Sequence, residues 1–269
     1  MLVPPDGREA AAARLRSAVT SHRSCAPVRD LLGTADIEAA YAVASANIAE
    51  RITAGRRRIG RKIGLTSPVV QRQLGVDRPD FGTLLDDMLV PAGTPAEHSG
   101  LFRPRAEAEV AFVLGRDLDD ESVDPRQAVA YALAAIEIVD SRITDWDITI
   151  VDTIADNASS ALFALGSERV PLDGLDLPGV QMELELNGVT ASTGTGEACL
   201  GDPLNALAWL AATARDIGEP LRAGEIVLSG ALGPMVDVGP GDRLTARLTG
   251  LGVVDVQFTG INGGTLGDD

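Results

Sequence analysis

The spacing of apolar residues changes along the chain, from a helical period near the N-terminus to short alternating runs further on. Apolar residues recur every three or four positions within residues 8–22 and 36–54, and this spacing predicts two helices. From Ile59 onward, short apolar runs alternate with frequent glycine and proline, which is typical of strands joined by loops. We therefore predict a small helical N-terminal region, residues 1–58, followed by a β-rich domain, residues 59–269.

Two Asp-Pro pairs indicate further helices within the β-rich domain. Asp124-Pro125 precedes residues 126–135, and Asp202-Pro203 precedes residues 204–216. Aspartate is a favoured N-cap residue, and proline fits the first helical turn because the N–H that it lacks would have no helical partner there. Both segments are therefore predicted to be helical.

The remaining patterns predict strands. Residues 181–187 alternate apolar and polar side chains and run into Asn187-Gly188, a strong signal for a hairpin with a type I′ turn. The C-terminal third adds predicted strands near residues 225–229, 243–248 and 253–259. Together with the N-terminal helices, these elements predict an α+β fold with a largely antiparallel or mixed β core.

Charge and composition narrow the partners and the compartment. The 269 residues carry a net charge of −16, which disfavours nucleic acid and anionic membranes because both are bound by clustered lysine and arginine. No apolar stretch approaches the roughly 20 residues that span a bilayer, and the N-terminus lacks the features of a signal peptide. Cys25 and Cys199 are far apart without metal-type spacing, which fits a reducing compartment. We expect a cytoplasmic protein with a small-molecule substrate.

The segment from Arg105 to Gly115 carries the first candidate chemistry. Glu107 and Glu109 alternate with apolar neighbours on a predicted strand. Alternate strand residues point to the same face roughly 6–7 Å apart, because each residue advances the strand by about 3.3 Å. Two carboxylates at that separation suit a shared hard cation. A solvated sheet face would show the same alternation, so these two glutamates alone do not decide the matter.

A third glutamate favours the metal interpretation. Glu137 lies between Ile136 and Ile138 in a second apolar run, where an unpaired carboxylate would cost several kcal/mol. Three carboxylates without nearby histidine or cysteine indicate Mg²⁺ or Mn²⁺ rather than Zn²⁺, because hard cations prefer oxygen ligands. Asp140 is an alternative third ligand.

Several familiar catalytic signatures are absent from the sequence. It contains no Gly-x-Ser-x-Gly elbow, no P-loop, no His-Glu-x-x-His motif and no complete dinucleotide fingerprint. The two histidines, His22 and His98, lie in a predicted surface helix and a loop, so a histidine general base is not favoured. Lys62 is the only lysine, the other 22 basic residues being arginine. A coding bias against lysine would give the same composition, so this observation is suggestive only.

Five motifs, taken in order, carry a resemblance to a known family. They are Gly60-Arg-Lys-Ile-Gly-Leu-Thr-Ser67, Leu74-Gly-Val-Asp-Arg-Pro-Asp-Phe-Gly82, the segment 105–115, Ile136-Glu-Ile-Val-Asp140 and Asp152-Thr-Ile-Ala-Asp-Asn-Ala158. With these motifs the chain resembles the 2-keto-4-pentenoate hydratases, also called 2-hydroxypenta-2,4-dienoate hydratases, of the fumarylacetoacetate hydrolase superfamily. The likeness continues through residues 200–205 and 228–235, so it covers nearly the whole chain.

The resemblance implies a fold, a cofactor and a set of site residues. The implied fold has a mixed β-roll core of the fumarylacetoacetate hydrolase type, and the implied cofactor is Mg²⁺ or Mn²⁺. The protein is expected to form homo-oligomers and to join complexes with other enzymes of its pathway. The implied site has Glu107, Glu109 and Glu137 as metal ligands, Lys62 and Asp80 as catalytic residues, and Ser160, Gly230 and Gly233 as substrate-binding residues.

All three substrate-binding assignments have a purely structural alternative. The turn over residues 229–234 offers backbone N–H groups that suit a carboxylate, but a tight strand exit would have the same sequence. Ser159 and Ser160 line the pocket in the family, although a packed helix of small residues would also explain them.

The reaction that the resemblance implies is hydration of 2-hydroxypenta-2,4-dienoate, or a close homologue, to 4-hydroxy-2-oxopentanoate in the meta-cleavage catabolism of aromatic compounds. A 2-oxo acid can chelate a divalent ion, which stabilises an enolate-like charge. Asp80 would then orient or deprotonate water, and Lys62, with a pKa lowered beside the cation, would donate a proton or anchor the carboxylate.

Three other functions fit the sequence less well. A 4-oxalocrotonate-type decarboxylase would use the same metal chelation, but the Pro-Asp-Phe-Gly stretch at residues 79–82 resembles the hydratase version. A C–C bond hydrolase would need a histidine–glutamate pair, and neither histidine lies in a matching motif. A non-catalytic partner subunit is disfavoured because Lys62, Asp80 and all three metal acids are intact.

Overall fold

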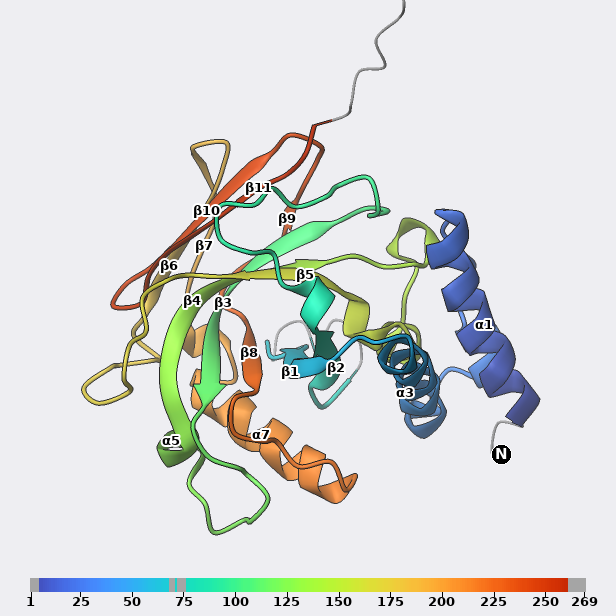
Figure 1. Ribbon diagram of the computed structural model, residues 1–269, viewed down its shortest axis with the longest axis horizontal. Coiled ribbons are helices and arrows are strands. Elements are labelled where there is room, and N and C mark those ends of the chain that lie inside the picture. Colours follow the sequence, from blue (N-terminus) through green and yellow to red (C-terminus); the bar gives the residue numbers. More distant parts are fainter. Residues whose placement is uncertain (1–4, 68–70, 72–75, 261–269) are drawn as a thin grey trace, which may run out of the picture.

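The protein is built from two β-sheets with helices packed around them (Figure 1). The computed structural model describes residues 5–67, 71 and 76–260. Its principal helices are α1 (Pro5–Ser21), α2 (Arg29–Leu32), α3 (Ile37–Thr53), α5 (Pro125–Ala128), α6 (Ile150–Ala155) and α7 (Pro203–Asp216). Its strands are β1 (Arg58–Gly64), β2 (Asp80–Leu85), β3 (Arg105–Leu114), β4 (Val129–Val139), β5 (Ser160–Leu165), β6 (Gln181–Leu186), β7 (Val189–Thr195), β8 (Ile226–Ala231), β9 (Val236–Asp237), β10 (Arg243–Leu248) and β11 (Gly252–Gln257).

The larger sheet is mixed and curled. Its strand order is β2-β1-β8-β3-β4-β5, with the short β9 paired to β3 beside β8. Only the β1–β8 pair among its described ladders is parallel, because the long connection between these strands allows β8 to enter beside β1 in the same direction. The prediction of a mixed β core is confirmed.

The smaller sheet covers one face of the larger one. Its order is β11-β10-β6-β7, and all of its described ladders are antiparallel. The predicted hairpin is confirmed, because β6 and β7 meet at Asn187 and Gly188, which have φ angles of 54° and 80°. Positive φ at both central residues is what a type I′ turn requires.

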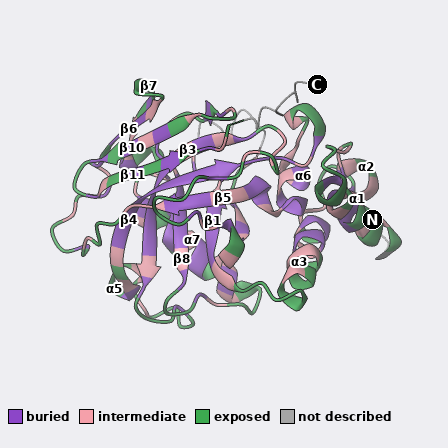
Figure 2. Cartoon of the chain, turned by 45° about the horizontal axis from the view of Figure 1, so that its top comes forward, coloured by how far each residue is buried: buried purple, intermediate pink, exposed green. Residues whose placement is uncertain are grey.

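The main hydrophobic core lies between the two sheets and α7. Along β3 the even-numbered side chains, such as Val110 and Phe112, are fully buried against this core. The odd-numbered side chains of β3 and β4 point to the opposite face, because strand residues alternate sides. That face carries Glu107, Glu109 and Glu137, and we call it the carboxylate face. Figure 2 shows that the burial is concentrated along the central strands.

Further along the strands, the carboxylate face becomes apolar. Ala111, Leu133 and Phe163 form a second buried cluster there, together with Leu84 and Leu228. The charged and apolar halves of this face therefore lie on the same strands, and apolar packing supports the charged half from one end.

The N-terminal helices form a third cluster, which they share with a later segment. Leu15 of α1, Val43 of α3 and Val28 pack against Val151 and Ile154 of α6. The helical region predicted for residues 1–58 is present, but its apolar core is completed by residues beyond that boundary. Its status as a separate domain stays a prediction.

One predicted helix is wrong. Residues 126–135 do not form a helix, because α5 ends at Ala128 and β4 begins at Val129. Asp124 does cap the turn, accepting a 2.9 Å hydrogen bond from the N–H of Arg126. From Val129 onward the chain instead pairs along the whole of β3 and alternates buried faces, so long-range pairing overrides the local helix signal.

The other predicted helices are confirmed within a few residues. Asp36 caps α3 through the N–H of Ala39, and Asp202 caps α7 through the N–H of Leu204. Leu74 and Gly75, which begin one motif of the resemblance, lie outside the described residues. Among the helices that the structure describes, none has the length and apolar character needed to cross a membrane.

A buried aspartate joins the N-terminal helices to α6. The Asp152 carboxylate is fully buried and accepts hydrogen bonds from the N–H groups of Val28, Arg29 and Thr149. The Arg29 guanidinium also lies 2.8 Å from this carboxylate and 2.7 Å from that of Asp147, which is 65% exposed.

We expect Asp152→Ala to lower the free energy of unfolding by about 3 kcal/mol, because it leaves the buried backbone donors unpaired and removes the buried partner of Arg29. Asp147→Ala removes the exposed partner of the same arginine and should cost less than about 1 kcal/mol. Urea unfolding of both variants measures the difference. Equal losses would contradict the structural role assigned to Asp152.

Candidate metal centre and active site

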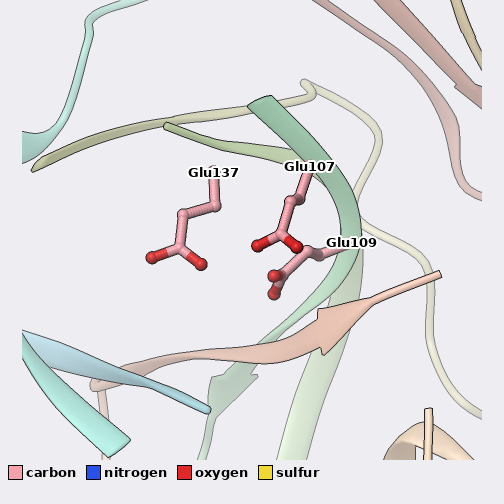
Figure 3. Close-up of side chains that lie close together, drawn as sticks. All are labelled: Glu107, Glu109 and Glu137. Carbon is pink, nitrogen blue, oxygen red and sulfur yellow. The ribbon is translucent and has the colours of Figure 1, made fainter. Parts of the chain in front are cut away.

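Three glutamates from neighbouring strands converge on the carboxylate face. Glu107 and Glu109 project from β3, and Glu137 projects from β4 directly opposite Glu107 in the antiparallel register. Figure 3 shows the three carboxylates pointing toward a common space. One carboxylate oxygen from each lies within 4.8 Å of the others. The structure therefore brings together the three acids that the sequence singled out as ligands.

The donor set fits a hard divalent cation. Glu109 and Glu137 are at most 1% exposed, whereas Glu107 is only partly buried. Within the described part of the chain, Oε1 of Glu109 is buried and has no hydrogen-bond partner. A buried carboxylate oxygen is costly unless it is paired or bound to a metal. Three carboxylates with no histidine or thiol ligand are the donors that Mg²⁺ and Mn²⁺ prefer.

Lys62 supplies the only positive charge that directly contacts these acids in the described chain. It projects from β1, is 2% exposed, and its Nζ lies 3.0 Å from each carboxylate oxygen of Glu137. Burial disfavours the ammonium ion, but the carboxylates of Glu137, Asp80, Glu107 and Glu109 together raise the pKa of Lys62 above its ordinary value.

This direction differs from the lowered pKa predicted for Lys62. The raised pKa describes the site without a bound cation, where the four surrounding carboxylates outweigh burial and favour the protonated form, whereas the lowered pKa was predicted for the lysine beside a cation and stays a prediction. Protonated Lys62 is therefore a donor and a counter-ion for Glu137.

Asp80 lies at the start of β2, opposite Gly64 of β1. It is 2% exposed, and burial raises its pKa to about 6, with Lys62 opposing the rise and Glu137 adding to it. Oδ1 of Asp80 has no hydrogen-bond partner within the described residues. A Cβ atom on Gly64 would lie 2.1 Å from this oxygen, so the glycine is what leaves room for the carboxylate. Asp80 can therefore exchange a proton near neutral pH.

The glutamates also resist ionisation. Burial, followed by the charge of Glu137, raises the pKa of Glu107 to about 7 and holds the pKa of Glu109 well above its usual range. Lys62 opposes both shifts, Arg105 also opposes that of Glu107 and the Gly230 N–H that of Glu109, but together they do not balance them. The site thus holds more carboxylates than its nearby cations can neutralise, and a divalent cation would relieve this imbalance of charge.

Gly230 has a role that the sequence did not predict. Its N–H donates a 2.8 Å hydrogen bond to Oε2 of Glu109. The pairing of β8 with β3 is irregular between Glu109 and Ala111, and Gly230 adopts a φ of 110° there. A Cβ atom at Gly230 would lie 2.3 Å from Oγ1 of Thr66. This irregularity turns a backbone donor away from the ladder and toward a candidate ligand, while the substrate-binding role of Gly230 stays a prediction.

Ser160 follows an unusual left-handed turn. Asn157, Ala158 and Ser159 have φ angles of 56°, 51° and 54°, a conformation that costs about 1–2 kcal/mol per residue. The Asn157 side chain stabilises the turn by accepting from the N–H of Thr83 at 2.7 Å and donating to its carbonyl at 2.9 Å. These residues are not the packed helix that the sequence allowed.

The left-handed turn places Ser160 close to the strand that carries Asp80. Oγ of Ser160 is buried without a hydrogen-bond partner in the described chain, and a Cβ atom on Gly82 would approach it to 2.8 Å. Its hydroxyl is thus available to a ligand, which is consistent with the predicted substrate-binding role.

Two candidates lie elsewhere. The backbone of Gly233 packs against Met182 and Thr193 of the smaller sheet, so its substrate-binding role stays a prediction without a described contact to the acids. Both oxygens of Asp140 accept backbone N–H groups, from Phe102 at 2.8 Å and Arg103 at 2.7 Å. Asp140 therefore holds a loop, and the suggestion that it replaces Glu137 as a ligand is wrong.

The sequence reasoning missed the residues that shape the site without joining the chemistry. Gly64, Gly82 and Asn157 lie within the motifs that carried the resemblance. Their functions were not visible because each depends on a contact with a distant strand. The glycines flanking Lys62 and Asp80 were the sequence feature that could have indicated that other segments of the chain approach closely there.

Comparison with known proteins identifies a coherent group of relatives. The family model for the fumarylacetoacetate hydrolase C-terminal domain matches residues 67–259. The chain is 52% identical over 257 residues to a 2-keto-4-pentenoate hydratase of Paraburkholderia xenovorans strain LB400, covering 94% of this chain and 96% of the relative. It is 42% identical over 251 residues to a 2-hydroxyhexa-2,4-dienoate hydratase of Comamonas testosteroni, covering 91% and 95%.

Among solved structures, the chain resembles 4-oxalocrotonate decarboxylase from Pseudomonas putida G7, complexed with magnesium and adipate. The TM-score is 0.89 and the sequence identity 32%, covering 95% of this chain and 98% of the other. The predicted fold type is thereby confirmed.

The raised pKa values predict how the stability of the metal-free protein depends on pH. A carboxyl whose folded-state pKa lies above its unfolded value binds protons more tightly when folded, so its stabilising effect at low pH is lost as the pH rises. In EDTA, we expect the free energy of unfolding to fall by about 4 kcal/mol between pH 4.5 and 7, with comparable contributions from Asp80 and Glu107.

Denaturant titrations at several pH values measure this slope. The double variant Asp80→Asn, Glu107→Gln should flatten it, whereas Asp86→Asn should not, because the pKa of the partly exposed Asp86 is lowered by its contacts with Arg57. A slope that is unchanged in the double variant would contradict the assignment.

Proposed function

Because this chain belongs to the fumarylacetoacetate hydrolase family, we propose that it is the 2-keto-4-pentenoate hydratase of a meta-cleavage pathway for aromatic compounds. The reaction adds water to 2-hydroxypenta-2,4-dienoate, or a close homologue, and gives 4-hydroxy-2-oxopentanoate. The observation that carries this conclusion is 52% identity to a named hydratase over nearly the whole chain, with every acid of the site and Lys62 in place. The enzyme is accordingly a hydro-lyase.

Glu107, Glu109 and Glu137 would hold the divalent cation. Their convergence within 4.8 Å and the orphaned oxygen of Glu109 support this assignment, and Mg²⁺ or Mn²⁺ suits the all-oxygen donors. When bound, such a cation polarises the carboxylate and 2-oxo oxygens of the substrate and stabilises enolate-like charge. The solved decarboxylase that this chain resembles was complexed with magnesium.

Asp80 and Lys62 would move the protons. Hydration requires one proton at the terminal carbon of the dienol and a hydroxyl group at C4, with a proton removed from water. Asp80, with its pKa of about 6 and a free carboxylate oxygen, suits orientation and deprotonation of that water. Protonated Lys62 suits donation of a proton or a hydrogen bond to the substrate carboxylate, while its contact with Glu137 holds it in place. Ser160 would bind the substrate through its free hydroxyl.

A 4-oxalocrotonate-type decarboxylase is the second candidate. The TM-score of 0.89 to such an enzyme favours it, since both reactions pass through an enolate of a 2-oxo acid. The identity of 32% is well below the 52% to the hydratase, so hydration is the primary proposal. Homo-oligomers, complexes with pathway enzymes, a cytoplasmic location and the division at residue 58 stay predictions from the sequence.

We expect purified protein with Mg²⁺ to convert freshly generated 2-hydroxypenta-2,4-dienoate to 4-hydroxy-2-oxopentanoate, and EDTA to abolish the reaction. Dienol absorbance and product analysis by NMR measure both, and added Mg²⁺ or Mn²⁺ should restore activity. Loss of dienol without hydrated product would indicate simple ketonisation. Turnover of 2-oxohex-3-enedioate with release of CO₂, in place of hydration, would favour the decarboxylase.

Asp80→Asn and Lys62→Ala should each lower kcat by about 10²–10⁴-fold, because general acid–base groups contribute on that scale. Their affinity for Mn²⁺, measured by calorimetry, should change by less than about tenfold, whereas Glu109→Gln should lose most of it. Asp86→Asn makes the same charge change as Asp80→Asn at a partly exposed position at the far end of β2 and serves as the control. Unchanged turnover in either of the first two variants would remove that residue from the mechanism.

A further inference from the structure

The carboxylate face has a gradient of burial that marks its mouth. Along β3, the Arg105 side chain is 28% exposed, Glu107 is partly buried and Glu109 is fully buried. These three residues alternate along one strand, so their side chains lie on the same face at spacings of roughly 6–7 Å. A ligand that reaches the acids from the Glu107 side therefore passes Arg105 first.

Arg105 is held at this mouth by two contacts. Its Nε lies 3.0 Å from Oδ1 of Asp237, and its guanidinium carbon lies 4.7 Å from the centre of the Trp146 ring. Arginine stacked on an aromatic face retains its planar donor fork for a carboxylate.

The loop that supplies Trp146 is strained. Asp145 and Trp146 have φ angles of 55° and 57°, and residues held in the left-handed region persist only when their surroundings enforce them. The indole Nε1 of Trp146 donates a 2.9 Å hydrogen bond to the carbonyl of Arg103, which fixes the ring beneath Arg105. The strained loop thus holds the Trp146 ring against Arg105 at the mouth of the site.

An anionic substrate needs a cation at this position. The chain carries a net charge of −16, and the site contains four carboxylates around one lysine that is paired with Glu137. Asp237, the partner of Arg105, is 78% exposed, and exposed ion pairs contribute little energy. A substrate carboxylate can therefore replace Asp237 at small cost and gain a charge-assisted hydrogen bond.

We propose that Arg105 is the capture residue for the substrate carboxylate, releasing Asp237 and holding the 2-oxo or 2-hydroxydienoate monoanion at the mouth of the site beside Trp146. The inference rests on the proposed function for the identity of the substrate. It adds a binding residue and a competing acid that act before the chemical step.

The test compares three variants of the full-length enzyme with Mg²⁺. Arg105→Ala should raise KM for the dienoate at least tenfold while changing kcat less than about threefold. Asp237→Asn should lower KM severalfold, because the internal competitor for Arg105 is removed. Arg243→Ala makes the same charge change on the smaller sheet, at a side chain that is 61% exposed, and should leave KM unchanged.

Two further readouts separate capture from general structural damage. The kcat/KM of the wild type should fall with ionic strength, and that of Arg105→Ala should fall less steeply. Calorimetric Kd values for 2-oxopentanoate, which cannot be hydrated, should follow the same order as KM across the variants. The opposite shifts expected for Arg105→Ala and Asp237→Asn cannot both arise from misfolding.

The outcomes distinguish this inference from the proposed function. If the wild type fails to hydrate the dienoate but the 2-oxopentanoate affinities follow the expected order, the hydratase assignment is wrong and the capture role is supported. If hydration proceeds and Arg105→Ala matches Arg243→Ala, or Asp237→Asn raises KM, the capture role is overturned. Absence of 2-oxopentanoate binding to the wild type would also overturn it.

Discussion

The burial of four carboxylates around one ammonium group is the constraint on which the structure depends. Glu107, Glu109, Glu137 and Asp80 project from three strands onto one face, and Lys62 alone opposes their charge by direct contact. Charges in a poorly solvated interior repel strongly, and the raised pKa values of the acids express that cost. A divalent cation would offset it, so the same arrangement that destabilises the bare fold creates affinity for the metal.

The surrounding backbone is adapted to this crowded face. Gly64 leaves space for the Asp80 carboxylate, and Gly230 turns its N–H toward Glu109 where the β3–β8 ladder is irregular. The left-handed turn at residues 157–159 is strained, but Asn157 fixes it to the strand that carries Asp80. The opposite face of β3 and β4 is entirely apolar by comparison, and it packs against the smaller sheet and α7. Close packing of the apolar face thereby supports the strained backbone next to the carboxylate face.

Hydratases and decarboxylases of this family can share one scaffold because both reactions stabilise an enolate of a 2-oxo acid. The family fold supplies the three carboxylates, and the specific reaction is then set by which groups deliver protons and water around them. In the proposed mechanism those groups would be Asp80 and Lys62. Burial raises the pKa of Asp80 to about 6, whereas the surrounding carboxylates favour the protonated form of Lys62. This difference in protonation state would let one group accept a proton while the other donates one.

The sequence by itself determined the fold class, most elements and the identity of the three clustered acids. Alternation placed Glu107 and Glu109 on one face, the caps at Asp36 and Asp202 began the correct helices, and Asn187-Gly188 gave the hairpin, because each of these signals is local. The tertiary structure decided what depends on distant partners. It made residues 129–135 a strand rather than a helix by pairing them with β3, assigned Asp140 to a loop, and surrounded Lys62 with four carboxylates that raise its pKa in the metal-free site. Strand pairing and electrostatic fields sum over residues that are remote in the sequence, and no local pattern contains that sum.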